Sequence, residues 1–409
     1  MLTFADILAA RERIRGGVLE TPCSPSPALS EHLNCEIWCK LELLQRTGSF
    51  KERGARNALL SLSDAERKRG VIAASAGNHA LALAWHGTSL GIPVTVVMPR
   101  FAPLVKQANC RRYGAHVELR GESFGEAKAF ADEVAVQQGL RYIHGYDDPE
   151  IIAGAGTIGL EIVEQCPGFD TVIVPVGGAG LLAGVSLAVK ELQPQSRIVG
   201  VEPAATPCFA RAQAEGHSVP VENQPTLADG LSVPRTGSLA FEIARPRLDR
   251  LVVVSEADIA LAIVRLMEWE KMVVEGAGAA SLAAVLRGKM PEIQGKKVVL
   301  LLCGGNIDLS LLPRLIDTAL IVDGRLARFT ATISDRPGGL ARLANLLAEV
   351  GVSVQEIDHD REFSGPNVAA VNVCCTVETR DGEQIAELYR ALTAAGIRHF
   401  AHQATGDSN

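Results

Sequence analysis

One lysine lies in a segment whose composition suits chemistry by an amine. Residues 45–57 read QRTGSFKERGARN, and Gly48 and Ser49 place Lys51 at the expected start of a helix. An amine that loses its proton is a nucleophile or a base, whereas an exposed lysine stays charged and inert. Taken alone, Lys51 is interpreted as a surface lysine, so the segments that lie near it decide its role.

Three turns of small residues follow apolar runs and precede expected helices: SAGNH (75–79), GGAGL (177–181) and CGGN (303–306). The first N–H groups of a helix have no partner within the helix, and together with its dipole they attract phosphate or carboxylate. The glycine turn (177–181) is the strongest signal because its small residues let backbone amides converge. The SAGNH turn could instead be an ordinary helix cap. Together the three turns predict one phosphorylated ligand in one cleft.

A dinucleotide site is a competing interpretation of the glycine turn. Residues 178–183 fit the pattern GxGxxG/A, and Glu202 follows at the end of the next expected strand. This interpretation explains neither of the other two turns and gives Lys51 no role. We therefore favour a phosphorylated ligand beside Lys51.

Apolar runs rich in β-branched residues alternate with helical segments from about residue 70 to residue 305. The runs predict strands at 71–77, 94–99, 171–177, 197–203, 250–256 and 297–303. Runs of this kind are typical of buried parallel strands, and the segments between them supply crossover helices. The pattern predicts an α/β fold with parallel sheets covered by helices on both faces, and ligands at the carboxyl ends of the strands.

The pattern changes after about residue 322, which divides the chain into expected domains 1–322 and 323–409. The second part predicts a strand at 328–333, a helix led by DRPGG, strands at 352–357 and 371–377, a helix at 381–395 and a strand near His399. This βαββαβ order is the ferredoxin-like pattern.

Composition excludes several classes of protein. The net charge of −7 is spread without long runs of one sign, which argues against nucleic-acid or membrane partners. The nine cysteines form no CxxC pair, the N-terminus lacks a secretory pattern, and the longest apolar run is far too short to span a bilayer. We expect a reduced, cytoplasmic protein.

The combination TGSFKERGA, SAGNHA, PVGGAGLLAG and CGGN, with DDPEIIAGAGTIGLEI and MPRFAPLVKQ, resembles the fold type II pyridoxal phosphate enzymes, within them the threonine and serine dehydratases. The similarity covers residues 5–320. The motif DRPGGLARLANLLAEVG resembles the ACT-like domain attached to some threonine dehydratases. The resemblance implies a two-lobed catalytic domain that dehydrates and deaminates L-threonine to 2-oxobutanoate and ammonia, and possible activity on L-serine. It also implies a homodimer or homotetramer.

The resemblance assigns roles residue by residue. It makes Lys51 the lysine that carries pyridoxal phosphate and exchanges the α-proton. The other cofactor-binding residues are Phe50 beside the ring, Asn78 at the ring hydroxyl, Gly177, Gly178, Ala179, Gly180 and Leu181 at the phosphate, and Cys303 at the pyridine nitrogen. The substrate carboxylate falls to Ser75, Gly77, Asn78 and His79.

Two positions depart from the commonest family pattern. The family usually has glycine where Ala179 stands, and a methyl group is tolerable there only if φ is negative. Cys303 stands where many relatives have serine. A buried apolar cysteine is the alternative interpretation. A neutral thiol makes the ring a weaker electron sink than a carboxylate would, which favours elimination over transamination.

Other activities of the family remain as alternatives. A serine racemase needs a second acid/base on the other face of the α-carbon, and Ala76 stands at that position. Racemisation is therefore disfavoured. Other β-elimination or β-replacement enzymes of this fold type remain an alternative, among which the cysteine synthases are less favoured because their substrate loops differ from SAGNHA. The non-enzyme alternative is an inactive regulator that senses an amino acid, against which the intact Lys51 and Asn78 argue.

Two further expectations concern a cation and an effector. The family binds a cation near the position of Glu202, and because Cys208 stands where some relatives have a second carboxylate, we expect a monovalent cation or a weakly bound divalent one. The alternative is a solvated or helix-capping glutamate. The tail is expected either to bind an amino-acid effector such as isoleucine or valine, or to serve dimerisation alone.

Overall fold

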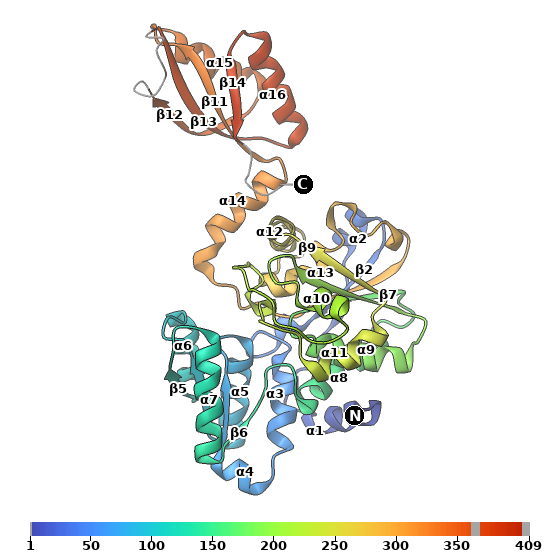
Figure 1. Cartoon of the computed structure of the whole chain (residues 1–409). Helices are drawn as coiled ribbons and strands as arrows, with labels where there is room; N and C mark the ends of the chain where they lie inside the picture. Colours follow the sequence, from blue (N-terminus) through green and yellow to red (C-terminus); the bar gives the residue numbers. More distant parts are fainter. Residues whose placement is uncertain (1, 361–368, 403–409) are drawn as a thin grey trace. The chain divides into compact units, whose positions relative to one another are not determined.

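The computed structural model describes residues 2–360 and 369–402, in two compact units that meet in sequence between Asp308 and Leu309. The first unit contains two sheets, which Figure 1 shows as separate lobes. The larger sheet has the strand order β1-β2-β10-β7-β8-β9, and the smaller has the order β5-β4-β3-β6. All neighbouring strands are parallel except β1, which is antiparallel to β2.

The strands of the first unit are β1 (Cys23–Pro25), β2 (Glu36–Leu41), β3 (Val71–Ala74), β4 (Val94–Met98), β5 (His116–Leu119), β6 (Arg141–Tyr142), β7 (Thr171–Pro175), β8 (Arg197–Pro203), β9 (Arg250–Val254) and β10 (Lys297–Leu302). The six expected strands are confirmed as β3, β4, β7, β8, β9 and β10. Most of them end a few residues earlier than expected, because the chain turns at the small residues that follow.

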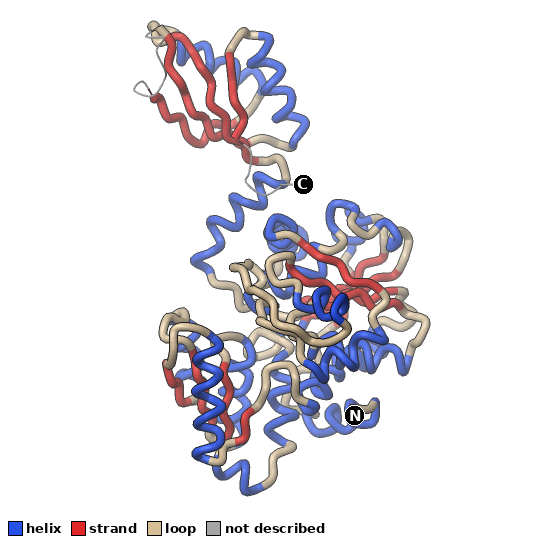
Figure 2. The backbone as a smooth tube through the Cα atoms, in the orientation of Figure 1, coloured by secondary structure: helices blue, strands red, loops and turns tan. Residues whose placement is uncertain are grey.

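The helices of the first unit are α1 (Phe4–Ile14), α2 (Pro27–Leu33), α3 (Lys51–Leu60), α4 (Asp64–Arg69), α5 (Asn78–Leu90), α6 (Leu104–Arg112), α7 (Phe124–Gln138), α8 (Pro149–Gln165), α9 (Gly180–Leu192), α10 (Cys208–Glu215), α11 (Ser238–Ala244), α12 (Glu256–Arg265) and α13 (Gly276–Ala283). Short 3-10 turns are η1 (Glu42–Leu44), η2 (Asp229–Leu231), η3 (Arg245–Arg247), η5 (Leu286–Gly288) and η6 (Pro291–Ile293), and η4 (Leu266–Glu270) is a π-helical turn. Figure 2 shows these helices around the strands.

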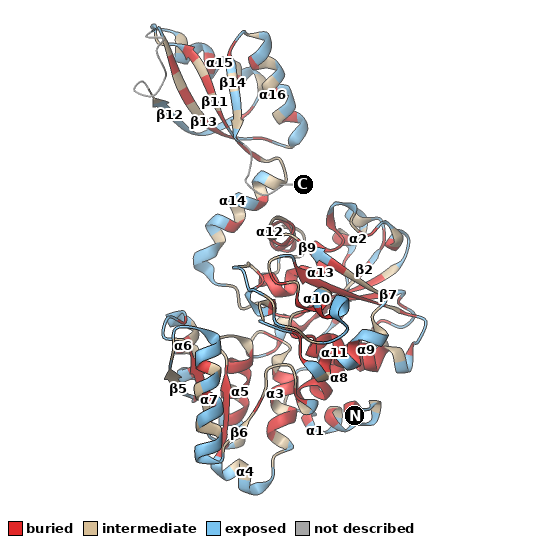
Figure 3. Cartoon of the chain, in the orientation of Figure 1, coloured by how far each residue is buried: buried red, intermediate tan, exposed pale blue. Residues whose placement is uncertain are grey.

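Alternate side chains of the smaller sheet enter two different cores. Val71 and Ala73 of β3 pack toward α5, whereas Ile72 and Ala74 pack toward Ala127 and other residues of α7. A parallel sheet covered on both faces buries successive side chains on opposite sides. Figure 3 shows the resulting band of buried strands and helices. The expected α/β fold is confirmed.

The second unit begins with η7 (Leu309–Leu311) and α14 (Leu312–Val322), and continues with β11 (Leu326–Ser334), α15 (Gly339–Val350), β12 (Ser353–Asp360), β13 (Ala370–Glu378), α16 (Gly382–Ala394) and β14 (Arg398–His402). Its antiparallel sheet has the order β12-β13-β11-β14, as a ferredoxin-like βαββαβ fold requires. Helix α14 contacts β11 and belongs to the compact unit that begins at Leu309. No helix in the described residues is long and apolar enough to cross a membrane.

Candidate functional site

Lys51 is the first residue of α3, and the CGGN turn holds the loop before it. The backbone N–H of Phe50 donates to the carbonyl of Cys303 at 3.0 Å, and the N–H of Gly305 donates to the carbonyl of Gly48 at 2.9 Å. This bridge fixes the lysine against the carboxyl end of β10. The phenyl ring of Phe50 lies 4.9 Å from the Lys51 amine.

The Lys51 amine is desolvated. Its Nζ donates to the carbonyl of Gly145 at 2.6 Å. Burial lowers the pKa of Lys51 to about 8, and the nearby Cys303 and Glu275 partly oppose the shift. An ammonium group loses hydration when buried, which favours the neutral amine. Lys51 is therefore poised to act as a nucleophile or base near neutral pH, unlike a surface lysine.

The glycine turn offers a set of unused hydrogen-bond donors. Within the described residues, none of the backbone N–H groups from Gly177 to Leu181 donates to a protein acceptor. Most of this turn is buried, where unpaired N–H groups are rare and costly. An anion such as a phosphate would satisfy them at the N-terminus of α9.

The SAGNH turn has the same property at the N-terminus of α5. The N–H groups of Ala76, Asn78 and His79 have no protein acceptor among the described residues, while that of Gly77 donates to the Ser75 hydroxyl at 3.2 Å. A Cβ atom on Gly77 would meet no other atom within 4 Å, so the turn faces open space. These donors suit a carboxylate.

The CGGN turn was expected to contribute to the same anion-binding cleft, but its polar groups form hydrogen bonds within the protein. The side-chain amide of Asn306 donates to the carbonyl of Thr47 at 2.7 Å and to Oδ1 of Asn78 at 2.8 Å. Together with the hydrogen bond from the Gly305 N–H to the Gly48 carbonyl, these contacts give the turn a structural role. It joins the Lys51 loop to the SAGNH turn rather than forming a third anion site.

His79 is a neutral residue that fixes the back of the SAGNH turn. Its Nε2 lies 3.1 Å from the carbonyl oxygen of Ile143. Burial, with Lys51 nearby, lowers the pKa of His79 to about 3. The imidazole therefore carries no charge near neutral pH, and its backbone N–H is what it can offer to an anion.

Ala179 has the positive φ that was expected to be unfavourable for a residue with a Cβ atom. Its φ is +71° and it precedes α9. The left-handed conformation costs an alanine roughly 1–2 kcal/mol relative to its usual conformation. The glycine turn is thus strained at Ala179, within the same segment whose backbone N–H groups are free to bind an anion.

Cys303 follows β10 and is 2% exposed. Burial, and the nearby Glu275 to a lesser extent, raise the pKa of Cys303 well above its usual value. The thiol therefore stays neutral, as expected for a residue that does not protonate a ring nitrogen.

Glu202, the candidate cation ligand, caps a helix. Its carboxylate accepts the backbone N–H groups of Phe209 and Ala210, at 2.8 and 3.0 Å, at the start of α10. Burial raises the pKa of Glu202 to about 7 despite these bonds. Cys208 donates its thiol to the carbonyl of Val233. Over residues 2–360 and 369–402, no three His, Cys, Asp or Glu side chains are grouped to hold a metal.

Two elements of the site were missed by sequence reasoning. The loop between β6 and α8 supplies the Gly145 carbonyl to Lys51, and its Tyr146 packs so closely on the glycine turn that a Cβ on Gly178 would lie 2.1 Å from the ring. The buried Glu275, before α13, accepts the side-chain N–H of Asn78 at 2.7 Å. The small-residue run after Glu275 was the available signal for a closely packed helix start.

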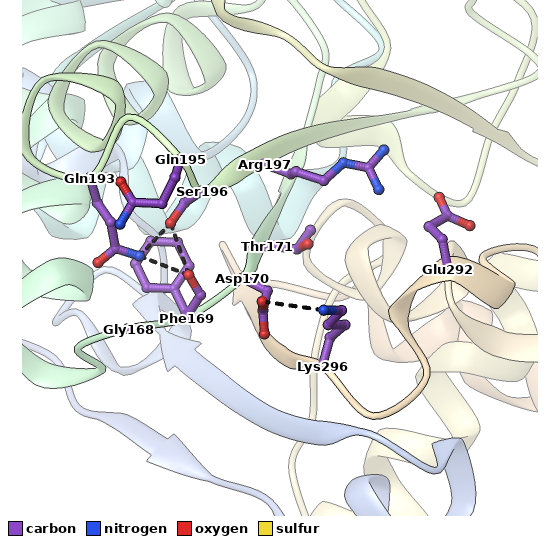
Figure 4. Close-up of a pocket in the computed structure, with 10 residues that line it drawn as sticks. All are labelled: Gly168, Phe169, Asp170, Thr171, Gln193, Gln195, Ser196, Arg197, Glu292 and Lys296. Carbon is purple, nitrogen blue, oxygen red and sulfur yellow. Dashed lines mark hydrogen bonds and ion pairs between the residues drawn. The ribbon is translucent and has the colours of Figure 1, made fainter.

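A separate pocket of this unit lies at the amino ends of β7 and β8 in the larger sheet, beside Thr171 and Arg197 (Figure 4). Its polar groups bond to one another, as Gln193 and Ser196 do with the Phe169 carbonyl. This pocket is separate from the lysine.

The fold and site define a two-lobed α/β protein in which a desolvated lysine lies among elements that carry two turns able to bind anions. A phosphorylated aldehyde that attaches to an amine fits these residues. The chain belongs to the pyridoxal-phosphate dependent enzymes, whose family model matches residues 14–304.

Individual relatives extend this comparison. An L-threonine ammonia-lyase of Thermotoga maritima is 42% identical over 396 residues, which are 97% of this chain and 98% of that protein. The processed threonine deaminase isoform 2 of Solanum lycopersicum is 36% identical, covers 77% of this chain and 86% of its own, and superposes with a TM-score of 0.73. The serine racemase of Dictyostelium discoideum is 34% identical, covers 75% and 99%, and has a TM-score of 0.70. The expected family is confirmed.

Proposed function

We propose that this protein is a threonine ammonia-lyase that converts L-threonine to 2-oxobutanoate and ammonia. The observation that carries the proposal is the half-buried Lys51, whose amine has a lowered pKa beside the carboxyl end of β10, in a chain that is similar over almost its whole length to an L-threonine ammonia-lyase. Lys51, Asn78 and the glycine turn would hold pyridoxal phosphate, which withdraws electrons from the α-carbon of an amino acid when bound.

The protein's own residues divide the remaining work. The N–H groups of the SAGNH turn bind the substrate carboxylate, which places the α-carbon beside Lys51. The Lys51 amine accepts the α-proton and later returns a proton, because its lowered pKa allows both states near neutral pH. Loss of the β-hydroxyl and hydrolysis of the product then release 2-oxobutanoate and ammonia.

Ala76 supports elimination over racemisation. The residue packs against the core of the smaller lobe and has no group that can transfer a proton to the second face of the α-carbon. The structural likeness to a serine racemase keeps that activity as the second candidate. Chiral analysis decides between them: D-amino acid formed faster than 2-oxo acid would contradict our proposal.

The assay compares the release of 2-oxo acid and ammonia from L-threonine and L-serine. We expect both to react, with threonine preferred. An extra methyl group in an apolar pocket changes the free energy of binding by only about 1–3 kcal/mol, so dual activity is compatible with the proposal. A protein that binds pyridoxal phosphate but deaminates neither amino acid would favour the non-catalytic sensor.

We further propose a regulatory role for the C-terminal part, within a domain division at 1–322 and 323–409. Its ferredoxin-like fold supports an ACT-like interpretation, in which paired copies bind an amino-acid effector. Isoleucine or valine should change the kinetics of the full chain, and removal of residues 323–409 should abolish the response. Unchanged kinetics in both tests would leave a role in dimer or tetramer assembly.

We propose that a monovalent cation binds near Glu202, in which case activity should depend on potassium. Equal rates in potassium and in a bulky organic cation would mean that Glu202 serves only as a helix cap. The nine free cysteines suit a reducing, cytoplasmic location.

A further inference from the structure

Glu275 is a buried carboxyl group that the proposed reaction does not use. The residue is 4% exposed and precedes α13. In the described part of the chain, no lysine or arginine lies within ion-pair distance of its oxygen atoms. A buried carboxyl group without an ionic partner is expensive, so its hydrogen bonds indicate why the protein keeps it.

The Glu275 carboxyl group joins two turns of the site. Its Oε1 accepts the side-chain N–H of Asn78 at 2.7 Å, and the backbone N–H of Asn306 also bonds to the carboxyl group. The backbone N–H of Glu275 donates to the carbonyl of Gly304 at 3.1 Å. A Cβ atom on Gly304 would lie 2.2 Å from Oε1, so glycine is needed for this approach.

These contacts fix the orientation of the Asn78 amide. Asn306 uses both of its side-chain N–H groups, one on Thr47 and one on Oδ1 of Asn78. The Thr47 carbonyl can only accept, so the Asn306 nitrogen faces it and also donates to Oδ1 of Asn78, which leaves the Asn78 nitrogen facing Glu275. One N–H of that nitrogen donates to Glu275, and the second is left as a donor for a ligand.

We propose that Glu275 is a positioning residue for pyridoxal phosphate, acting through Asn78 by holding its amide so that one N–H remains available to the ring hydroxyl. The inference rests on the proposed function. In this proposal, the hydrogen bonds from Asn306 to Asn78 and from Asn78 to Glu275 hold one N–H of Asn78 in a fixed orientation toward the cofactor.

The charge of Glu275 reaches Lys51 as well. The carboxylate raises the pKa of Lys51, while burial and the nearby Asp229 raise the pKa of Glu275 itself to about 7. Lys106 and the Asn78 hydrogen bond oppose the latter shift. Removal of the charge should therefore favour the unprotonated form of the Lys51 nitrogen.

The test uses the full chain reconstituted with pyridoxal phosphate, in wild type, Glu275→Gln and the control Glu292→Gln. Glu292 pairs with Arg250, outside the proposed site. We expect Glu275→Gln to weaken cofactor binding by at least about tenfold, because a neutral amide accepts the Asn78 N–H less strongly than a carboxylate and, since it can also donate, no longer fixes the orientation of the Asn78 amide. The pH midpoint of the visible absorption band should also move to lower pH. The control should change neither quantity.

A double-mutant comparison tests whether Glu275 acts through Asn78. In an Asn78→Ala background, Glu275→Gln should change cofactor affinity by less than about twofold, since coupled residues are not additive. An equal loss in both backgrounds would overturn the inference. If Glu275→Gln does not fold, Asn306→Ala removes the other anchor of Asn78 and should weaken cofactor binding too; unchanged binding would overturn the inference.

The two proposals fail in different ways. A wild-type protein without a visible band after reconstitution contradicts the proposed function. A wild type with the band, and a folded Glu275→Gln variant with unchanged affinity and midpoint, contradicts only the role of Glu275.

Discussion

At the scale of single residues, Lys51 combines a desolvated amine with the lack of an ion-pair partner among the described residues. Lys40 is also buried, but it pairs with Glu161. Lys128 forms a surface pair with Asp132. Lys51 donates instead to a backbone carbonyl, which supplies no charge to hold its proton. The same burial keeps His79 and Cys303 neutral. Of Lys51, His79 and Cys303, Lys51 is therefore the group that can exchange a proton near neutral pH.

The lowered pKa of Lys51 predicts how the cofactor-free protein reacts with pyridoxal phosphate. Only the unprotonated amine attacks an aldehyde, so the rate of covalent capture should rise with pH and level off above about 8. Well below that pH the rate should fall about tenfold per pH unit. Stopped-flow absorbance from pH 6 to 9 measures it. A rate that is flat below pH 8 would contradict the assigned pKa.

The strain at Ala179 predicts a stabilising substitution. Ala179→Gly removes the unfavourable positive φ but adds freedom to the unfolded chain, so we expect a net gain of up to about 1 kcal/mol in the free energy of unfolding. Urea denaturation of the cofactor-free protein measures it. Ala188→Gly, in the buried interior of α9, should instead destabilise the protein. Destabilisation by both would show that Ala179 is not strained.

At the scale of elements, a buried ionic network anchors α3 behind Lys51. Arg53 of α3 pairs with Glu42 of η1 and with Glu161 of α8, and Lys40 of β2 also pairs with Glu161. All four side chains are at most 9% exposed. The network joins four elements, α3, η1, α8 and β2, near the start of the helix that begins with the lysine.

Loss of one acid from this network should be costly. Glu161→Ala leaves Arg53 and Lys40 buried with too few partners, and we expect a loss of about 3–5 kcal/mol in the free energy of unfolding. The matched control is Glu164→Ala on the same helix, whose exposed pair with Arg11 should contribute less than about 1 kcal/mol. Equal losses in the free energy of unfolding for the two substitutions, measured by chemical denaturation, would show that the buried network contributes no more to stability than a surface ion pair.

The elements predicted from sequence were those that local pattern defines. The apolar runs identified β3, β4 and β7 to β10, and the small residues after three of them identified the turns. Strand β2 was missed because it contains Glu36 and Lys40, and only the fold brings Lys40 to Glu161. Strands β5 and β6 are short and partly exposed, so they lack a clear apolar period.

At the scale of the whole molecule, the site depends on contacts between segments far apart in sequence. Glu275 and Asn78 are 197 positions apart, and Lys51 and Gly145 are 94 apart. No local pattern encodes such pairs, which is why Glu275 and the Gly145 loop were missed. The sequence identified Lys51 and the glycine turn because each has a local signature, a helix start or a run of small residues.

The most direct test of the central claim compares the full chain with its Lys51→Ala variant after reconstitution with pyridoxal phosphate. Wild type should show a visible absorption band and release 2-oxobutanoate and ammonia from L-threonine. Lys51→Ala should lose both, while Lys128→Ala, the surface-lysine control, should keep both. A Lys51→Ala variant that retained the band and the turnover of threonine would contradict the account.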